Sequence, residues 1–256
     1  MNSPSQRYRL PRHIRIDLAL GAAIVWLLFA GAMPASAAQC PARPHNHASE
    51  STTPLNIGEL KLQVLDYLCF GAYERDVAGV LAEARRYVES ETGQFTKPAL
   101  VLDIDETSLS NRTQILANDF GYIPRGPCEH LPDGPCGSQA WELRHDAPAI
   151  APTLDFFDAA KAKGVAIFFI SGRNDGGAER SAIVANLTSA GYGGWTEIKL
   201  RPTGYNSVEA YKTAMRASIE AAGYTIVANI GDQYSDLRGG YAKRVWKLPN
   251  PFYYIP

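Results

Sequence analysis

The sequence predicts an α/β fold: a Rossmann-like parallel sheet with helices on both faces, a small cap-like insertion after the first strand and additional N-terminal helices. The first observation is a set of short apolar runs typical of strands buried on both faces: Ala99–Leu102, Val165–Ile170, Ile198–Leu200, Ile226–Ile230 and Val245–Leu248. The second is that helical patterns separate most of these runs. Strands that alternate with helices in this way indicate right-handed βαβ units and a parallel sheet.

Apolar residues recur at helical spacing in five segments. Two of these segments precede the first apolar run and three lie between later runs: Leu60–Leu68, Tyr73–Val88, Leu154–Lys163, Ala178–Ala190 and Val208–Ala222. Gly93, Gly191 and Gly223 follow three of them and are expected to end those helices. We interpret the apolar faces of these segments as the surfaces by which helices that cover the sheet face the core.

The stretch from Ser108 to Pro152 fits neither pattern, and we expect it to be a cap-like insertion over one edge of the sheet. It contains Cys128 and Cys136, which enclose a loop rich in turn-forming residues. A disulfide between these two is the preferred pairing among the four cysteines. A zinc site with His130 or His145 is the alternative, although the spacing matches no compact zinc pattern.

The N-terminus reads as a signal peptide over residues 1–37, followed by a linker over residues 38–54 and one domain over residues 55–256. Four arginines precede the apolar stretch Leu18–Met33, and Ala35-Ser36-Ala37 offers a cleavage site. The alternative is an uncleaved membrane anchor, but that stretch of 16 residues is shorter than the ~20 that span a bilayer. We therefore expect an exported protein, periplasmic or secreted, with no stable membrane span after cleavage.

Composition excludes several classes of protein. The chain has 256 residues, 46% of them hydrophobic, which is enough for a sizeable core. Its 25 Lys and Arg against 26 Asp and Glu give a formal net charge of −1, which argues against a nucleic-acid-binding domain, although nucleotides remain possible substrates. The oligomeric state is not predicted.

Polar residues that directly follow the apolar runs carry the functional information, because ligands of open parallel sheets bind beyond the carboxyl ends of the strands. These segments are Asp103-Ile104-Asp105-Glu106-Thr107, Ser171-Gly172-Arg173-Asn174-Asp175 and Gly231-Asp232-Gln233-Tyr234-Ser235-Asp236. The segment Val208–Ala222 adds Lys212 near its start. Together, in this order, they predict one site.

The residue types suit a metal ion and a phosphate group. Asp103 and Asp105 point the same way in extended chain, and crowded carboxylates attract a hard divalent cation such as Mg²⁺. Asp232 can close that metal site from another strand. Lys212 and the Ser171 hydroxyl can bind phosphoryl oxygens, and Gly172 lets backbone N–H groups approach the anion.

These segments resemble the four motifs of the haloacid dehalogenase superfamily of phosphohydrolases. More narrowly, Asp103-Ile104-Asp105-Glu106-Thr107 and Ile230-Gly231-Asp232-Gln233-Tyr234-Ser235-Asp236-Leu237 are similar to the exported acid phosphatases, which include bacterial class B and class C enzymes and the plant vegetative storage proteins. The closing Leu248-Pro249-Asn250-Pro251 also resembles that family, and the resemblance covers roughly Leu55 to the C-terminus. It does not distinguish class B from class C.

The resemblance implies a role for each residue. Asp103 is the nucleophile that forms an aspartyl-phosphate, and Asp105 is the acid that protonates the leaving alcohol and later the base that accepts a proton from water. Ser171, Gly172, Arg173 and Lys212 bind the substrate, with Lys199 as the rival of Lys212. For Arg173, the alternative is a role as a solvated or structural residue. The cofactor is Mg²⁺, held by Asp103, Asp232 and the backbone carbonyl of Asp105, with Asp236 nearby or linked through water.

The expected function is a Mg²⁺-dependent acid phosphatase that hydrolyses small phosphomonoesters. A protonated Asp105 agrees with an acidic pH optimum, which the resemblance implies. Two alternatives stay open: a storage or binding protein of the same fold with little activity, and a phosphotransferase whose intermediate is attacked by an alcohol. Neither the physiological substrate nor the pH optimum itself is predicted.

Overall fold

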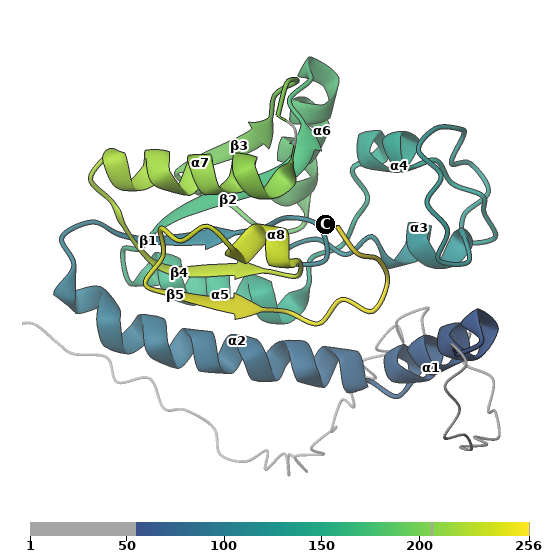
Figure 1. Ribbon diagram of the computed structural model, residues 1–256, viewed down its shortest axis with the longest axis horizontal. Coiled ribbons are helices and arrows are strands. Elements are labelled where there is room, and N and C mark those ends of the chain that lie inside the picture. Colours follow the sequence, from purple (N-terminus) through teal and green to yellow (C-terminus); the bar gives the residue numbers. More distant parts are fainter. Residues whose placement is uncertain (1–54, 206, 256) are drawn as a thin grey trace, which may run out of the picture. The chain divides into compact units, whose positions relative to one another are not determined.

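The computed structural model describes residues 55–205 and 207–255, and the predicted parallel sheet lies within them (Figure 1). Its five strands follow the order β3-β2-β1-β4-β5, and every neighbouring pair is parallel. The strands are β1 (Pro98–Leu102), β2 (Ala166–Asn174), β3 (Glu197–Arg201), β4 (Thr225–Gly231) and β5 (Arg244–Lys247). All five apolar runs are therefore strands. The predicted signal peptide (1–37) and linker (38–54) lie outside the described residues.

The helices confirm the five predicted helical segments and add short ones. They are α1 (Ile57–Cys69), α2 (Ala72–Glu91), α3 (Arg112–Ala117), α4 (Ser138–Arg144), α5 (Ala151–Ala162), α6 (Gly177–Ser189), α7 (Val208–Ala221) and α8 (Tyr234–Leu237), with a 3₁₀ turn η2 (Thr92–Gln94) after α2. The short helices α3, α4 and α8 have no amphipathic period long enough to be predicted. Within the described part of the chain, no helix is both long and apolar enough to cross a bilayer.

Helices cover both faces of the sheet, as predicted. Along β1 the side chains alternate: Leu100 and Leu102 pack into one core, and Ala99 and Val101 into another. The first core includes residues of α2, α5 and α6, and the second includes Tyr211 and other residues of α7. With apolar layers on both sides, the central strands β1, β2 and β4 have largely apolar sequences up to their carboxyl ends.

Strand β2 is longer than predicted, and this changes the setting of three candidate residues. The apolar run ends at Ile170, but β2 continues to Asn174 because Ser171 pairs with Leu200 and Asn174 pairs with Arg201 across a register shift. Ser171, Gly172 and Arg173 therefore belong to the end of the strand and not to the loop after it. A run of apolar residues cannot predict this extension, because the extension is polar.

The insertion lies at the edge that the carboxyl ends of the strands form, where Figure 1 shows α3 and α4. A short antiparallel pairing closes its base: the N–H of Ser110 donates to the carbonyl of Pro148 (2.9 Å) and the N–H of Ile150 to that of Ser108 (2.9 Å). Helix α4 packs against α6. The insertion thus adjoins the end of the sheet where the candidate residues are.

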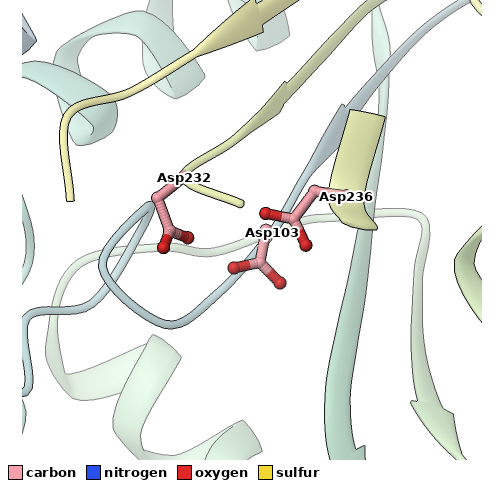
Figure 2. A group of neighbouring side chains, drawn as sticks. All are labelled: Asp103, Asp232 and Asp236. Carbon is pink, nitrogen blue, oxygen red and sulfur yellow. The ribbon is translucent and has the colours of Figure 1, made fainter. Parts of the chain in front are cut away.

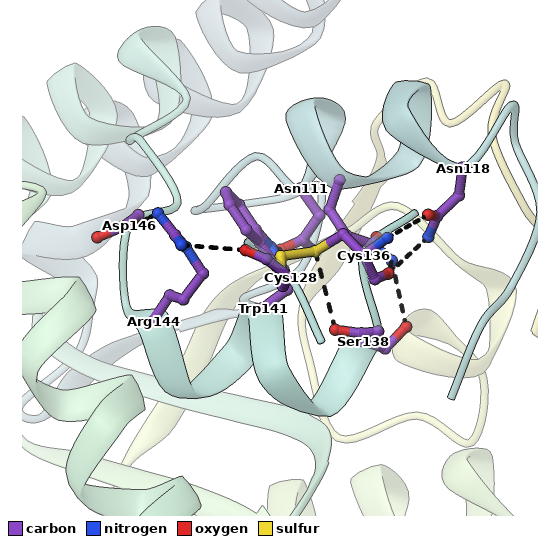
Figure 3. The surroundings of a disulfide bond; sticks show 10 residues. Asn111, Asn118, Cys128, Cys136, Ser138, Trp141, Arg144 and Asp146 are labelled. Atoms are coloured by element: carbon purple, nitrogen blue, oxygen red, sulfur yellow. Dashed lines mark hydrogen bonds and ion pairs between the residues drawn. A yellow bond between two sulfur atoms is a disulfide. The ribbon is translucent and has the colours of Figure 1, made fainter. Parts of the chain in front are cut away.

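The disulfide between Cys128 and Cys136 is confirmed (Figure 3), and the zinc alternative is wrong because both sulfur atoms are in the bond. Asn118 anchors this loop: its Nδ2 donates to the Cys136 carbonyl (2.8 Å) and its Oδ1 accepts from the Cys136 N–H (2.8 Å). The insertion is therefore held by a covalent link and by side-chain hydrogen bonds to its backbone.

Candidate functional site

Three aspartates from separate elements converge at the carboxyl end of the sheet (Figure 2). Asp103 directly follows β1, Asp232 directly follows β4, and Asp236 lies in α8. One carboxylate oxygen from each lies within 4.8 Å of the others, and all three residues are buried. We call Asp103, Asp232 and Asp236 the acidic cluster.

Lys212 of α7 joins two members of the acidic cluster. Its Nζ donates to Asp103 Oδ1 and, over 2.6 Å, to Asp236 Oδ1, and the ammonium group is almost completely buried. Lys199, its rival in the sequence, lies in β3 and pairs with Glu197 instead (2.8 Å). Only Lys212 is therefore in a position to act with Asp103.

Asp232 is fixed by three side-chain donors. Thr107 Oγ1 donates to its Oδ1 (3.0 Å), and Gln233 Nε2 (2.8 Å) and Asn250 Nδ2 (2.7 Å) both donate to its Oδ2. Asn250 comes from the closing Leu248-Pro249-Asn250-Pro251 segment, so the tail of the domain helps to orient this carboxylate. All of these bonds leave acceptor capacity on Asp232, since a carboxylate has about four lone-pair sites.

Gly231 allows the cluster to close. A Cβ atom at this position would lie 2.3 Å from Asp236 Cβ and 2.5 Å from Asp236 Oδ2, which is far inside van der Waals contact. Only glycine lets α8 turn back so that Asp236 comes this close to the end of β4. The glycine of the Gly231-Asp232 pair is therefore needed for close approach and not for a positive φ.

Burial and crowding determine the proton affinities in the cluster. Burial raises the pKa of Asp103 well above its usual range, against the lowering charge of Lys212, and burial raises the pKa of Asp232 to about 6. Burial would lower the pKa of Lys212, but Asp103 and Asp236 raise it above its usual value. When all are ionised, three carboxylates and one ammonium leave two negative charges, so this oxygen-only donor set fits a hard divalent cation.

The Asp105 side chain lies apart from the acidic cluster and pairs with Arg173. The Arg173 Nη2 donates to Asp105 Oδ1 (2.6 Å), and its Nε lies 3.1 Å from both Asp105 oxygens. Burial alone would raise the pKa of Asp105, but the charge and hydrogen bonds of Arg173 hold it below its usual value. This pairing therefore favours an ionised Asp105, whereas the expected acid role needs a protonated one.

Ser171 and Gly172 lie beside this pair at the end of β2. Ser171 is fully buried, and its Oγ accepts a hydrogen bond from the backbone N–H of Arg173 (3.1 Å). A Cβ at Gly172 would lie 3.3 Å from Val208 Cγ1, so glycine allows α7 to pack closely there. This hydrogen bond from the Arg173 N–H to Ser171 Oγ orients the end of β2, where Arg173 lies.

Two side chains that the sequence pattern did not place near Asp105 form a chain of hydrogen bonds that ends at its carboxylate. Asn111 Nδ2 donates to Asp105 Oδ1 (2.8 Å), and Trp141 of α4 donates its Nε1–H to Asn111 Oδ1 (2.7 Å). Trp141 is buried within the insertion. The spacing from Asp105 to Asn111 follows no period, so only the fold brings these side chains together.

Glu106 lies at the turn after Asp103. It is fully buried with a positive φ of 50°, and burial raises its pKa to about 8. Glu142 of α4 is partly buried, and burial raises its pKa while the charge of the nearby Arg173 lowers it. The insertion therefore places an acidic side chain in the field of the Arg173–Asp105 pair.

Comparison with known proteins identifies a family and several proteins that this chain resembles in sequence. A family model described as HAD superfamily, subfamily IIIB (Acid phosphatase) matches residues 27–256. Acid phosphatase 1 of Solanum lycopersicum is 31% identical over 196 residues, covering 75% of this chain and 73% of that protein. The stem 28 kDa glycoprotein of Glycine max is 36% identical over 197 residues (74% and 72%), and vegetative storage protein 1 of Arabidopsis thaliana is 32% identical over 209 residues (80% and 73%).

A solved structure has the same fold. The class C acid phosphatase from Bacillus anthracis superposes with a TM-score of 0.59 at 21% sequence identity, and the match covers 76% of this chain and 86% of that one. This similarity supports the α/β architecture described above.

Proposed function

The chain belongs to the acid phosphatase subfamily, IIIB, of the haloacid dehalogenase superfamily, a family of phosphomonoesterases, and from this premise we propose an exported, Mg²⁺-dependent enzyme that hydrolyses small phosphomonoesters through an aspartyl-phosphate. The observation that carries the proposal is the convergence of Asp103, Asp232 and Asp236 around one point, with the Lys212 ammonium joining two of them. That arrangement combines a nucleophile, a cation site and a positive charge for phosphoryl oxygens.

Asp103 and Asp232 would hold the Mg²⁺ ion with their side chains, together with the backbone carbonyl of Asp105. Both oxygens of Asp236 already have donors, Lys212 Nζ and the backbone N–H of Gln233 (2.8 Å), so a link through water suits Asp236 better than a direct bond. When bound, the ion neutralises charge on the phosphoryl oxygens and favours the ionised form of Asp103.

In the first step, an ionised Asp103 oxygen attacks phosphorus in line with the ester oxygen. The bond from phosphorus to that ester oxygen breaks, Asp105 donates a proton to the departing oxygen, and the alcohol leaves. Lys212, Ser171 and the N–H groups around Gly172 bind the other phosphoryl oxygens. The products of this step are a free alcohol, an aspartyl-phosphate at Asp103 and an ionised Asp105.

In the second step, water attacks the same phosphorus atom. Asp105, now ionised, accepts a proton from the water while the bond from phosphorus to Asp103 breaks. Inorganic phosphate leaves, and Asp103 is again an ionised carboxylate while Asp105 is again protonated. The proton that Asp105 gave in the first step is thus recovered in the second.

Arg173 accounts for the ionised form of Asp105 at this site. Its guanidinium group neutralises Asp105 there, and a doubly charged phosphoryl group competes for the same guanidinium. When the guanidinium turns toward the substrate, the buried Asp105 loses its main stabilising charge and its pKa rises. Substrate binding by Arg173 and protonation of Asp105 are then coupled, so that one favours the other.

Export is supported by the disulfide and by the leader sequence. The bond between Cys128 and Cys136 is typical of proteins that fold in an oxidising compartment. Relatives from Glycine max are named stem glycoproteins. We therefore propose that residues 1–37 direct the chain out of the cytoplasm and are removed.

The test is release of phosphate from a chromogenic phosphomonoester at pH 5 to 6, with Mg²⁺ and with EDTA. We expect turnover with Mg²⁺, loss of turnover with EDTA, and a fall of at least about a thousandfold in Asp103→Asn, because the nucleophile is gone. Asp158→Asn is the matched control, since Asp158 is exposed on α5. Full activity in Asp103→Asn would refute the nucleophile assignment.

The same assay decides between hydrolysis and its alternatives. A storage protein, as two relatives from Arabidopsis thaliana are named, would release no phosphate under any acidic condition with Mg²⁺. A phosphotransferase would convert an added alcohol or nucleoside into a new phosphomonoester at the expense of free phosphate. The presence of Asp103, Asp105, Asp232 and Lys212 together favours hydrolysis, because each is needed for turnover and none for storage.

A further inference from the structure

We propose that Trp141 and Asn111 are positioning residues that hold Asp105 at the angle needed for proton transfer, so that the insertion controls the acid step of the reaction. The inference rests on the proposed function, in which Asp105 protonates the leaving group. It concerns two side chains that touch neither the phosphoryl group nor the metal site, and it assigns the insertion a direct part in the chemistry.

The indole of Trp141 fixes which way the Asn111 amide faces. An indole N–H is only a donor, so the amide group that meets Trp141 Nε1 at 2.7 Å must be the oxygen of Asn111. The Nδ2 group then faces the other way, where it donates to Asp105 Oδ1 (2.8 Å) and to Glu106 Oε2 (2.9 Å). Both N–H bonds of the amide are therefore used on adjacent carboxylates (Figure 3 shows Asn111 beside Trp141).

Glu106 anchors Asn111 from the opposite side. Its Oε1 accepts the backbone N–H of Asn111 (2.6 Å), and its Oε2 also accepts the hydroxyl of Tyr253 (2.9 Å) from the C-terminal segment. Glu106 holds a positive φ of 50°, which is uncommon outside glycine, and these bonds stabilise that turn. Asn111 is thus held through its backbone, its amide nitrogen and its amide oxygen.

This support matters most when Arg173 leaves Asp105. In the structure, both Arg173 and Asn111 donate to the Asp105 carboxylate, and Arg173 Nη2 also lies 3.5 Å from Asn111 Oδ1. Once the phosphoryl group draws the guanidinium away, Asn111 is the remaining side-chain donor that the structure gives to Asp105. Its amide must then keep the protonated carboxyl aimed at the ester oxygen, and Trp141 keeps the amide from turning.

Removal of the indole N–H should therefore affect proton donation selectively. An alkoxide leaving group needs a proton, whereas p-nitrophenolate departs as a stable anion and needs little help. Loss of positioning lowers turnover of alkyl phosphates more than turnover of aryl phosphates. A merely structural loss would lower both by the same factor, because both substrates use the same nucleophile and cation site.

The experiment measures kcat/KM for p-nitrophenyl phosphate and for an alkyl phosphate in Trp141→Phe, which keeps an aromatic ring but removes the N–H. We expect a loss of about tenfold or more for the alkyl phosphate and less than about threefold for the aryl phosphate, since a well-placed general acid contributes about a hundredfold or more. Trp246→Phe is the matched control. Trp246 is equally buried, and its Nε1 has no partner among the described residues, so only packing changes there.

Equal losses for the two substrates in Trp141→Phe would overturn the inference. If Trp141→Phe does not fold, as judged by thermal unfolding, Asn111→Ala is assayed instead, with the same expected selectivity for the alkyl phosphate and the same refuting result. A failure of the proposed function gives a different result from a failure of this inference, because the wild-type chain would then release no phosphate from either substrate.

Discussion

The candidate site has two halves that are held in different ways. The acidic cluster and Lys212 lie on α7, on α8 and at the ends of β1 and β4, and β1, β4 and α7 contribute side chains to the two cores of the sheet. Asp105 also follows β1, but its partners are Arg173 and Asn111, and Asn111 is fixed by Trp141 of the insertion. The sheet and its helices (the scaffold half) thus carry the proposed nucleophile and cation site, whereas the disulfide-linked insertion (the insertion half) carries the residues proposed to position the acid. The two halves should respond differently to mutation.

The largest effect is expected from Lys212→Met, in the scaffold half. It removes the cation that joins Asp103 to Asp236, and an uncompensated buried charge costs about 3–5 kcal/mol. We expect that loss in the free energy of unfolding, measured with urea in EDTA, and a fall of more than about a hundredfold in kcat for both aryl and alkyl phosphates.

Lys199→Met is the control for this variant, because Lys199 pairs with the exposed Glu197 at the sheet edge. We expect its free energy of unfolding to change by less than about 1 kcal/mol. If Lys212→Met lowered turnover of alkyl phosphates alone, the division into two halves would be wrong.

The next effect is expected from Gly231→Ala, which tests how tightly the scaffold half is built. The new Cβ would collide with Asp236, so the end of β4 or α8 must shift, at a cost of about 1–3 kcal/mol. We expect a higher Mg²⁺ concentration for half-maximal activity and a lower melting temperature. Gly177→Ala in α6 is the control, since nothing lies within 4 Å of a Cβ there and the melting temperature should not fall. Unchanged Mg²⁺ dependence in Gly231→Ala would contradict the geometry of the cluster.

In the insertion half, the disulfide should contribute stability without affecting the nucleophile. Cys128 and Cys136 close a short loop, and removal of such a link costs about 2–3 kcal/mol. For the double variant Cys128→Ser and Cys136→Ser, we expect that loss in urea unfolding and a smaller kcat/KM for alkyl phosphates, with aryl phosphates affected less. The opposite selectivity would show that the insertion does not act through Asp105.

The two halves also differ in how far the sequence predicts them. In the scaffold half, Asp103 and Asp232 come at the ends of buried apolar runs and Lys212 lies on an amphipathic helix, so parallel topology brings these three to one edge. Local pattern and global fold agree there. The extension of β2 to Asn174 was missed because its residues are polar, and the pairing that creates it depends on the register with β3.

The insertion half could not be predicted in the same way. Its two short helices show no sustained period, and the positions of Asn111 and Trp141 depend on bonds between segments that are 30 residues apart. The disulfide was predicted, since the cysteines and turn formers are local features. The ionised state of Asp105 was not, because it depends on Arg173, which comes from another strand.

The smallest effect is expected from Asp175→Asn, which removes an ion pair two residues beyond Arg173. Asp175 Oδ1 accepts from Arg180 Nε (2.7 Å) in an exposed pair, and this hydrogen bond holds the pKa of Asp175 below its usual value. A lowered pKa in the folded state adds stability above the unfolded pKa of 3.8, and that stability is lost as the pH falls through the folded value. Solvent screening limits it to less than about 1 kcal/mol.

The wild-type chain should therefore be slightly more stable than Asp175→Asn at pH 7, and in urea unfolding the difference should shrink and vanish as the pH falls below 3.8 and through the lowered pKa of the folded state. Turnover of both classes of phosphate should stay unchanged, because Asp175 and Arg180 bond to each other and not to the acidic cluster or Asp105. A fall in turnover of either class in Asp175→Asn would extend the site past Arg173. Together with Lys212→Met, this variant separates a buried ion pair that catalysis needs from an exposed one on the same edge of the sheet.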